Sequence, residues 1–119
     1  RGQLDHMVTD SQKLLRAGVA LAERTFEVAR GELQWRPEAL DELVLHQVSK
    51  THTQTVARSL GVDTEKMLAI YPEFGNVGPA SVPIVLSKAA EAGRVAPGAR
   101  VALMGIGSGL NCTMAEVRW

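Results

Sequence analysis

The chain has 119 residues, 45% of them hydrophobic, which is enough for one compact domain with a core but not for two. Thirteen Lys and Arg residues balance thirteen Asp and Glu residues without forming blocks, which argues against nucleic acid or an anionic membrane surface as a partner. With one cysteine, no Cys/His cluster of zinc spacing and no apolar run of roughly 20 residues, we expect a cytoplasmic protein without a disulfide, metal site or membrane span.

The first predicted element is a long amphipathic helix. The segment Thr9-Asp10-Ser11-Gln12 has the form of a capping box, and the helix is expected to end near Gly31. Apolar residues recur between them at three- and four-residue spacing, which predicts one buried stripe. The stripe consists of Leu14, Leu15, Gly18, Leu21, Ala22, Phe26 and Ala29.

A short buried strand is predicted at residues 40–45, because an apolar run follows the interruption at Pro37. His46 comes directly after it and therefore lies at the carboxyl end of the strand. The acidic pair Asp41-Glu42 is expected to be solvated, since acid–base chemistry needs a burial that its neighbours do not suggest.

A second helix is predicted to begin at a cap formed by Ser49 or Thr51 and to stop at Gly61, a residue type favoured just after helix ends. Its apolar stripe also carries His52, which we interpret as a partly buried structural histidine. Strand, turn and helix thus present His46 at a junction.

A second strand is predicted at the apolar run 67–71, and the loop that follows it carries Asn76. Asn76 follows Gly75, so it could also close an Asx turn. His46 and Asn76 would then both follow strands. In open α/β sheets, ligands bind in the crevice outside the carboxyl ends of the strands, so this placement predicts a site.

A third helix is predicted from Pro79, and two antiparallel strands at 100–106 and 111–119 are joined by a glycine-rich turn. Along the last strand, Cys112 to Arg118 alternate between two faces, with Cys112 and Met114 on the same one. The predicted order is α-β-α-β-α-β-β, an α/β layer.

Three phrases carry a family resemblance, and they occur in compatible spacing. They are His46-Gln47, then Phe74-Gly75-Asn76 followed by Ala80-Ser81-Val82-Pro83, and finally Gly105-Ile106-Gly107-Ser108-Gly109-Leu110. Over residues 40–119 the chain resembles the carboxyl-terminal half of the thiolase-fold condensing enzymes, in the ketoacyl-acyl-carrier-protein synthase III group. Within this group it looks most like the acyl-CoA condensing enzymes of bacterial long-chain olefin biosynthesis.

The resemblance implies a thiolase-like fold, of which residues 1–119 form the carboxyl-terminal half-domain. Family members have two similar halves and work as homodimers, and their nucleophilic cysteine lies in the amino-terminal half. That half is absent from this chain, so it is expected as a separate chain or a cleaved segment. Because the sequence begins without Met, we expect a break before Arg1.

The implied reaction is a Claisen condensation of two fatty acyl-CoA thioesters to a β-keto product. His46 and Asn76 would donate hydrogen bonds to the enolate oxygen of the second thioester, and the backbone N–H of Ser108 would serve the acyl-enzyme. The site would be shaped by Gly75, Gly105, Ile106, Gly107 and Gly109. No cofactor is implied, since the coenzyme A thioester is the substrate.

Other interpretations remain open. The enzyme could be a synthase III that condenses acyl-CoA with malonyl-acyl-carrier protein, or the chain could be a non-catalytic scaffold subunit. Cys112 is interpreted as a small buried hydrophobe rather than a nucleophile. The glycine turn does not predict a dinucleotide site, because Leu110 stands where the third glycine of that motif belongs.

Overall fold

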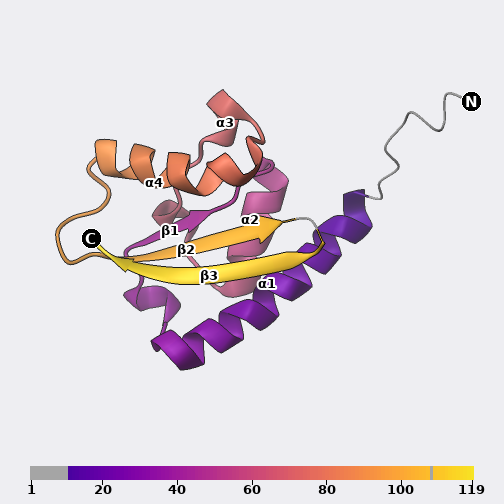
Figure 1. Cartoon of the computed structure of the whole chain (residues 1–119), viewed down its shortest axis with the longest axis horizontal. Coiled ribbons are helices and arrows are strands. Elements are labelled where there is room, and N and C mark those ends of the chain that lie inside the picture. Colours follow the sequence, from indigo (N-terminus) through magenta and orange to yellow (C-terminus); the bar gives the residue numbers. More distant parts are fainter. Residues whose placement is uncertain (1–10, 108) are drawn as a thin grey trace, which may run out of the picture.

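A three-stranded mixed sheet forms the centre of the molecule, with helices packed on it (Figure 1). The computed structural model describes residues 11–107 and 109–119. The strand order is β1-β2-β3; β1 and β2 are parallel, and β2 and β3 are antiparallel. The strands are β1 (Glu42–Leu45), β2 (Arg100–Gly107) and β3 (Asn111–Arg118), and the α-helices are α1 (Ser11–Leu33), α2 (Lys50–Leu60), α3 (Tyr71–Phe74) and α4 (Ser81–Glu91). Single 3-10 turns occur at Pro37–Ala39, Thr64–Lys66 and Gly78–Ala80.

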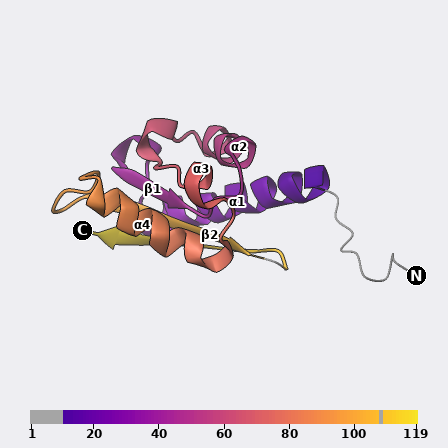
Figure 2. The same ribbon diagram turned by 90° about the horizontal axis from the view of Figure 1, so that it is seen from above.

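Alternate side chains of the sheet enter two separate cores. Leu43 and Leu45 of β1 and Met104 of β2 pack in a cluster with α1 and α2. Val44 and Val101 point the other way, into a cluster with α4. Figure 2 shows the strands lying between α4 and the pair α1 and α2. The sheet is therefore covered on both faces, and all four β1 residues are buried.

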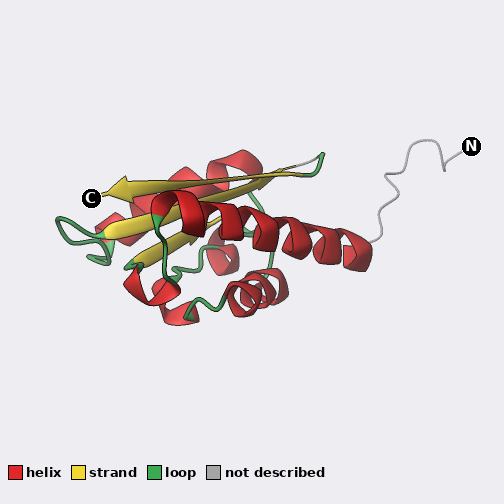
Figure 3. Ribbon diagram, turned by 90° about the horizontal axis from the view of Figure 1, so that it is seen from below, coloured by secondary structure: helices red, strands yellow, loops and turns green. Residues whose placement is uncertain are grey.

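The long helix α1 runs along one face of the sheet, as the view from below shows (Figure 3). It is the first predicted helix, although it ends at Leu33, two residues beyond Gly31. The predicted Thr9-Asp10 part of its cap lies outside the described residues. The buried members of the predicted stripe are Gly18, Ala22, Phe26 and Ala29. Leu14 at the other end of the stripe is 52% exposed. It belongs to the beginning of α1, which extends past the end of the sheet (Figure 3).

The second helix has the predicted boundaries. The Ser49 hydroxyl, rather than that of Thr51, accepts a hydrogen bond from the N–H of His52 at 3.2 Å and caps α2. Gly61 ends the helix in the left-handed region with φ of 69°, which a glycine adopts without a steric penalty. The strand–turn–helix unit around His46 is thus confirmed.

The predicted strand at 67–71 is wrong. Its apolar residues are buried, with Met67 in one core and Ile70 in the other, which explains the pattern in the sequence. Its backbone, however, pairs with a side chain: the Ile70 N–H donates to Gln47 Oε1 at 2.7 Å, and Gln47 Nε2 donates to the Leu68 carbonyl. The carboxamide of Gln47 therefore takes the place of a neighbouring strand, and α3 begins directly afterwards at Tyr71.

The prediction of a solvated acidic pair is wrong for Glu42. Its side chain is 1% exposed and accepts hydrogen bonds from Arg94 Nε at 2.5 Å and Nη2 at 2.9 Å. These bonds raise the pKa of Arg94, with burial opposing them. Asp41 is exposed, as predicted, and accepts a hydrogen bond from the N–H of Arg100 at 2.7 Å. Glu42 therefore has a structural partner 52 residues away that the local sequence does not reveal.

The third helix and the final hairpin follow the predicted order. The helix α4 begins at Ser81 rather than Pro79, because residues Gly78–Ala80 form a 3-10 turn first. Strands β2 and β3 pair antiparallel as predicted, with Ile106 opposite Cys112. Cys112 and Met114 pack against the α1 side, whereas Val117 packs on the α4 side, so the predicted alternation is confirmed.

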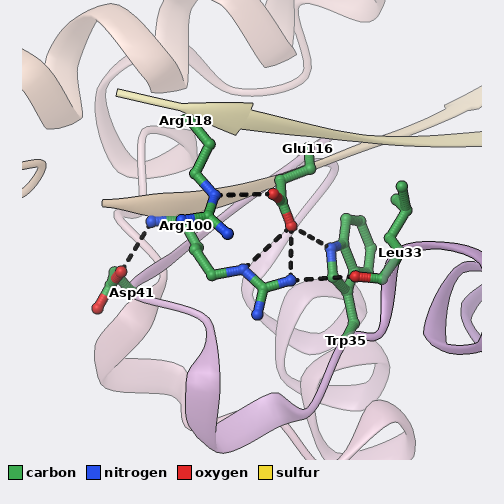
Figure 4. Close-up of polar contacts among 6 residues, drawn as sticks. All are labelled: Leu33, Trp35, Asp41, Arg100, Glu116 and Arg118. Atoms are coloured by element: carbon green, nitrogen blue, oxygen red, sulfur yellow. Dashed lines mark hydrogen bonds and ion pairs between the residues drawn. The ribbon is translucent and has the colours of Figure 1, made fainter. Parts of the chain in front are cut away.

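A polar network ties the end of α1 to the hairpin (Figure 4). Glu116 Oε1 accepts hydrogen bonds from Arg100 Nη2 and Trp35 Nε1, both at 2.8 Å, and Glu116 Oε2 accepts one from Arg118 at 3.1 Å. Arg100 also donates to the carbonyl of Leu33 at 3.1 Å. The hydrogen bonds from Arg100, followed by those from Trp35 and Arg118, lower the pKa of Glu116. This carboxylate therefore has a structural role at the amino end of β2.

Candidate active site

His46 lies one residue beyond β1, at the carboxyl edge of the sheet. Its N–H donates to the Met104 carbonyl at 2.9 Å, which extends the parallel ladder by one bond. Leu45 pairs with Met104, so β2 continues past the end of β1 with residues 105–107. The half-buried His46 and the beginning of the glycine turn therefore share one edge.

Gln47 is the residue of this region that sequence reasoning missed. Its N–H donates to Ser81 Oγ at 2.9 Å, and its side chain is almost fully buried. Its Oε1 accepts from the N–H groups of Ile70 and Tyr71 at 2.7 and 3.2 Å, while its Nε2 donates to the Leu68 carbonyl. One residue thus joins the end of β1 to the starts of α3 and α4. The available signal was its place directly after His46, in the phrase that carries the resemblance.

Asn76 follows the short helix α3, not a strand as predicted. Its Oδ1 accepts a hydrogen bond from the N–H of Gly78 at 3.0 Å, which closes an Asx turn. Gly75 ends α3 with φ of 64°, and Gly78 has φ of 61°, so the glycines on either side permit this turn. With the oxygen in the turn, the Nδ2 end of the exposed carboxamide is the end left to meet a ligand.

The glycine-rich turn connects β2 to β3 at the same edge. Ser108 lies outside the described residues, so its predicted role stays a prediction. A side chain at Gly107 would bring a Cβ within 3.0 Å of Asn111 Oδ1, and Gly109 has φ of 132°. Ile106 is half buried and packs against the core on the α1 side. The glycines therefore allow a close approach of backbone that bulkier residues would block.

His52 lies in the first turn of α2 and is half buried, as predicted. Its Nδ1 is buried, and among the described residues it has no hydrogen-bond partner. Burial lowers the pKa of His52, and the nearby His46 lowers it further. The side chain is therefore held neutral and fills space beside the candidate site.

Cys112 is half buried on the face of β3 that packs against α1. Burial raises the pKa of this thiol, and a hydrogen bond from Thr25 offsets the effect only in part. A nucleophilic cysteine needs the opposite shift, because the thiolate is the reactive form. The environment therefore agrees with the interpretation of Cys112 as a packing residue.

One cavity lies away from this edge, where the end of α1 meets the start of β2. It is open and has a volume of about 890 Å³; its lining residues are Glu27, Arg30, Gly31, Gln34, Trp35, Arg36, Ala39 and Arg100. In the described ranges, no group of three or more His, Cys, Asp or Glu side chains could hold a metal ion. No helix in those same ranges is long and apolar enough to cross a membrane.

His46 and the glycine turn lie at one edge of the sheet, and Asn76 follows α3, whose first residue is hydrogen-bonded to Gln47. Residues 31–119 match the family described as 3-oxoacyl-[acyl-carrier-protein] synthase III, C-terminal. The chain belongs to this family. Its thiolase-like fold class is confirmed by solved structures of synthase III type.

Curated relatives of the synthase III domain cover two kinds of condensing enzyme. The acyl-CoA:acyl-CoA alkyltransferase of Xanthomonas campestris is 56% identical over all 119 residues of this chain, which span 35% of that protein. The protein of the same description from Shewanella oneidensis is 36% identical over 97% of this chain and 33% of its own length. The β-ketoacyl-[acyl-carrier-protein] synthase III of Synechocystis is 29% identical over the whole chain and 36% of its own length.

Two solved structures superpose closely on the whole of this chain. The 3-oxoacyl-(acyl carrier protein) synthase III, FabH, of Xanthomonas oryzae superposes with a TM-score of 0.92 and is 56% identical. A variant of Xanthomonas campestris OleA with bound lauric acid and lauroyl-CoA gives a TM-score of 0.91 at 56% identity. Each match covers 100% of this chain and 35% of the other, so the chain spans about a third of these relatives.

Proposed function

We propose that this chain is the carboxyl-terminal half-domain of an enzyme that condenses two fatty acyl-CoA thioesters to a β-keto product, as in hydrocarbon biosynthesis. The observation that carries the proposal is the 56% identity with an acyl-CoA:acyl-CoA alkyltransferase over the whole chain. Over the same span, the synthase III of Synechocystis is 29% identical. The coenzyme A thioesters are substrates in this proposal, and no cofactor takes part.

His46 and Asn76 are the proposed donors to the thioester oxygen on which negative charge develops as the enolate forms. Both can offer a neutral N–H, which stabilises that charge without first neutralising it. The Asx turn of Asn76 directs the oxygen of the carboxamide to Gly78 and so supports the assignment of Nδ2 as the donor. Removal of one such donor typically costs about 2.7 to 4 kcal/mol of transition-state stabilisation.

The backbone N–H of Ser108 is the proposed donor to the tetrahedral intermediate of the acyl-enzyme. Support comes from the glycines on either side, since a Cβ at Gly107 would crowd the Asn111 side chain at 3.0 Å and Gly109 has a positive φ. A backbone that has no side chains at these positions can approach an acyl group closely. Gly75, Gly105 and Ile106 complete the proposed boundary of the site.

The proposed partner is the amino-terminal half of the same enzyme, which would supply the nucleophilic cysteine, in a homodimer of the complete protein. Three large apolar side chains near the site residues are exposed in this chain: Val48 at 40%, Phe74 at 43% and Leu110 at 36%. Each lies within two residues of a proposed site residue, which suits contact with an acyl chain or with the partner half.

The first test uses the complete enzyme with His46→Ala or Asn76→Asp, and with Gln54→Ala on the exposed side of α2 as the control. Acylation of the nucleophile, followed by intact mass, should proceed at the wild-type rate in all three. Condensation should fall about 10²- to 10³-fold in the two site variants only. Wild-type condensation by either site variant would refute its assignment.

A synthase III that uses malonyl-acyl-carrier protein is the second candidate, favoured by the 56% identity with the Xanthomonas oryzae structure of that description. The two reactions differ in carbon dioxide, which is released only when a malonyl group is decarboxylated. The complete enzyme should form a β-keto product from acyl-CoA alone under the first proposal. A strict requirement for a malonyl thioester, with release of carbon dioxide, would establish the second.

A further inference from the structure

We propose that Gln47 is a positioning residue, which sets the loop of Asn76 relative to His46. This inference rests on the proposed function. The hydrogen bonds of the Gln47 side chain join the main chain of Leu68, Ile70 and Tyr71 rather than His46 or Asn76. Gln47 acts by holding the starts of α3 and α4, the two helices on either side of the Asn76 loop.

The first step of the argument is the way in which Gln47 is held. It is the residue directly after His46, and its own N–H is fixed by Ser81 Oγ at 2.9 Å. Gln47 is 1% exposed and Ser81 is fully buried, so water does not compete for this bond. The backbone that carries His46 is thereby tied to the first residue of α4.

The second step is what the carboxamide does with its two ends. Its Oε1 accepts from the N–H groups of Ile70 and Tyr71, and its Nε2 donates to the Leu68 carbonyl. Tyr71 is the first residue of α3, whose last residue is two positions before Asn76. The start of that helix is therefore placed by a side chain next to His46.

The third step is that Gln47 holds the helix on each side of the Asn76 loop. The loop of Asn76 lies between α3 and α4, and Gln47 contacts the start of each helix. Among the described residues, no strand pairs with residues 67–70, so Gln47 supplies the bonds that a neighbouring strand would supply elsewhere. Loss of its carboxamide would let the Asn76 loop shift relative to His46.

A shift of this kind should affect the enolate-forming step and leave the earlier step alone. In the complete enzyme, Gln47→Leu keeps the approximate size of the side chain but removes both of its hydrogen-bonding ends. We expect condensation to fall about 10- to 100-fold, since a displacement near 1 Å has effects of this size. The rate of acylation of the nucleophile should stay within about twofold of the wild type. That step is proposed to depend on the amino-terminal half and the Ser108 N–H, not on His46 and Asn76. The matched control is Gln54→Leu on the exposed side of α2, which should leave both steps unchanged.

A double variant separates positioning from a general loss of structure. If Gln47 acts through Asn76, then Gln47→Leu combined with Asn76→Ala should condense no more slowly than Asn76→Ala alone. Fully multiplied effects of the two substitutions, or an equal fall in acylation and condensation, would overturn the inference. So would wild-type condensation by Gln47→Leu when Asn76→Ala is impaired. If Asn76→Ala and His46→Ala are themselves fully active, it is the proposed function that fails.

Should Gln47→Leu not fold, Ser81→Ala tests the same connection with a smaller change. It removes the acceptor of the Gln47 N–H and leaves the carboxamide in place. We expect a severalfold fall in condensation with unchanged acylation. Unchanged condensation in a folded Ser81→Ala enzyme would contradict the part of the inference that depends on α4.

Discussion

The buried carboxylate of Glu42, the first residue of β1, is held by both Nε and Nη2 of Arg94, which lies beyond the end of α4. Arg94 also donates to the carbonyl of Glu65, so its guanidinium joins three segments of the chain. The bonds to Glu42 raise the pKa of Arg94, with burial opposing them.

Replacement of Arg94 should therefore destabilise the complete enzyme strongly. Arg94→Met keeps much of the apolar stem but leaves the Glu42 carboxylate buried without its partner. Loss of one member of a buried pair typically costs about 3 to 5 kcal/mol; we expect the lower end here, because Arg94 is 31% exposed. Thermal unfolding measures the effect, with Arg24→Met on the exposed face of α1 as the control. Equal midpoints for the two variants would contradict the structural role of the pair.

The buried His52 should make stability depend on pH. Its folded-state pKa lies below the unfolded value of about 6.5, so between these values only the unfolded chain binds the proton. The contribution of His52 to the free energy of unfolding should consequently decrease as the pH falls below about 6.5 and stay constant above it. His52→Leu should raise the unfolding midpoint at pH 5.5 by more than it does at pH 8. A constant difference between the variant and the wild type over this range would refute the prediction.

Cys112 should be dispensable for the reaction. Burial raises the pKa of its thiol, so little thiolate is present at neutral pH. Cys112→Ala in the complete enzyme should still form the acyl-enzyme and condense within about twofold of the wild type, since its site packs against α1. Intact mass after incubation with acyl-CoA measures the first step. Loss of the covalent adduct would identify Cys112 as the nucleophile and overturn the proposal for the missing half.

The indole of Trp35 should contribute more to stability than its size suggests. It is 2% exposed, donates to Glu116 at 2.8 Å and lies 6.0 Å from the ring of Phe26. Trp35→Phe should cost roughly 1 to 3 kcal/mol, because it removes the donor and leaves a void. The matched control is Trp119→Phe, at a side chain that is 46% exposed. A comparable fall in the unfolding midpoint for both would show that the network has no special effect.

The sequence predicted those elements whose signals are local. The long stripe of α1, the Ser49 cap and Gly61 end of α2, and the alternation along β3 were all recognisable, because a repeat or a terminal residue defines each of them. The placement of His46 after a buried strand followed from the same kind of signal.

The errors arose where a distant side chain replaces a backbone partner. The run 67–71 is as apolar as a strand, and only the contact with Gln47 shows that its backbone is paired differently. Likewise, Glu42 looked solvated because its partner Arg94 is 52 residues away in the sequence. Periodicity reports burial reliably, but it does not report which group satisfies a buried polar atom.

The Asx turn between Asn76 and Gly78 also determines which chemical groups this loop can accept. Since the oxygen of the carboxamide is engaged by the main chain, a flip of the side chain would break the turn. The Nδ2 group of Asn76 is therefore the end of the carboxamide that can donate a hydrogen bond to an arriving atom. A carbonyl oxygen can accept this bond directly, whereas a hydroxyl or thiol must direct its own hydrogen away from Nδ2 to accept it. A preference for hydrogen-bond acceptors is thus built into the three residues of this turn, whatever the length of the acyl chain.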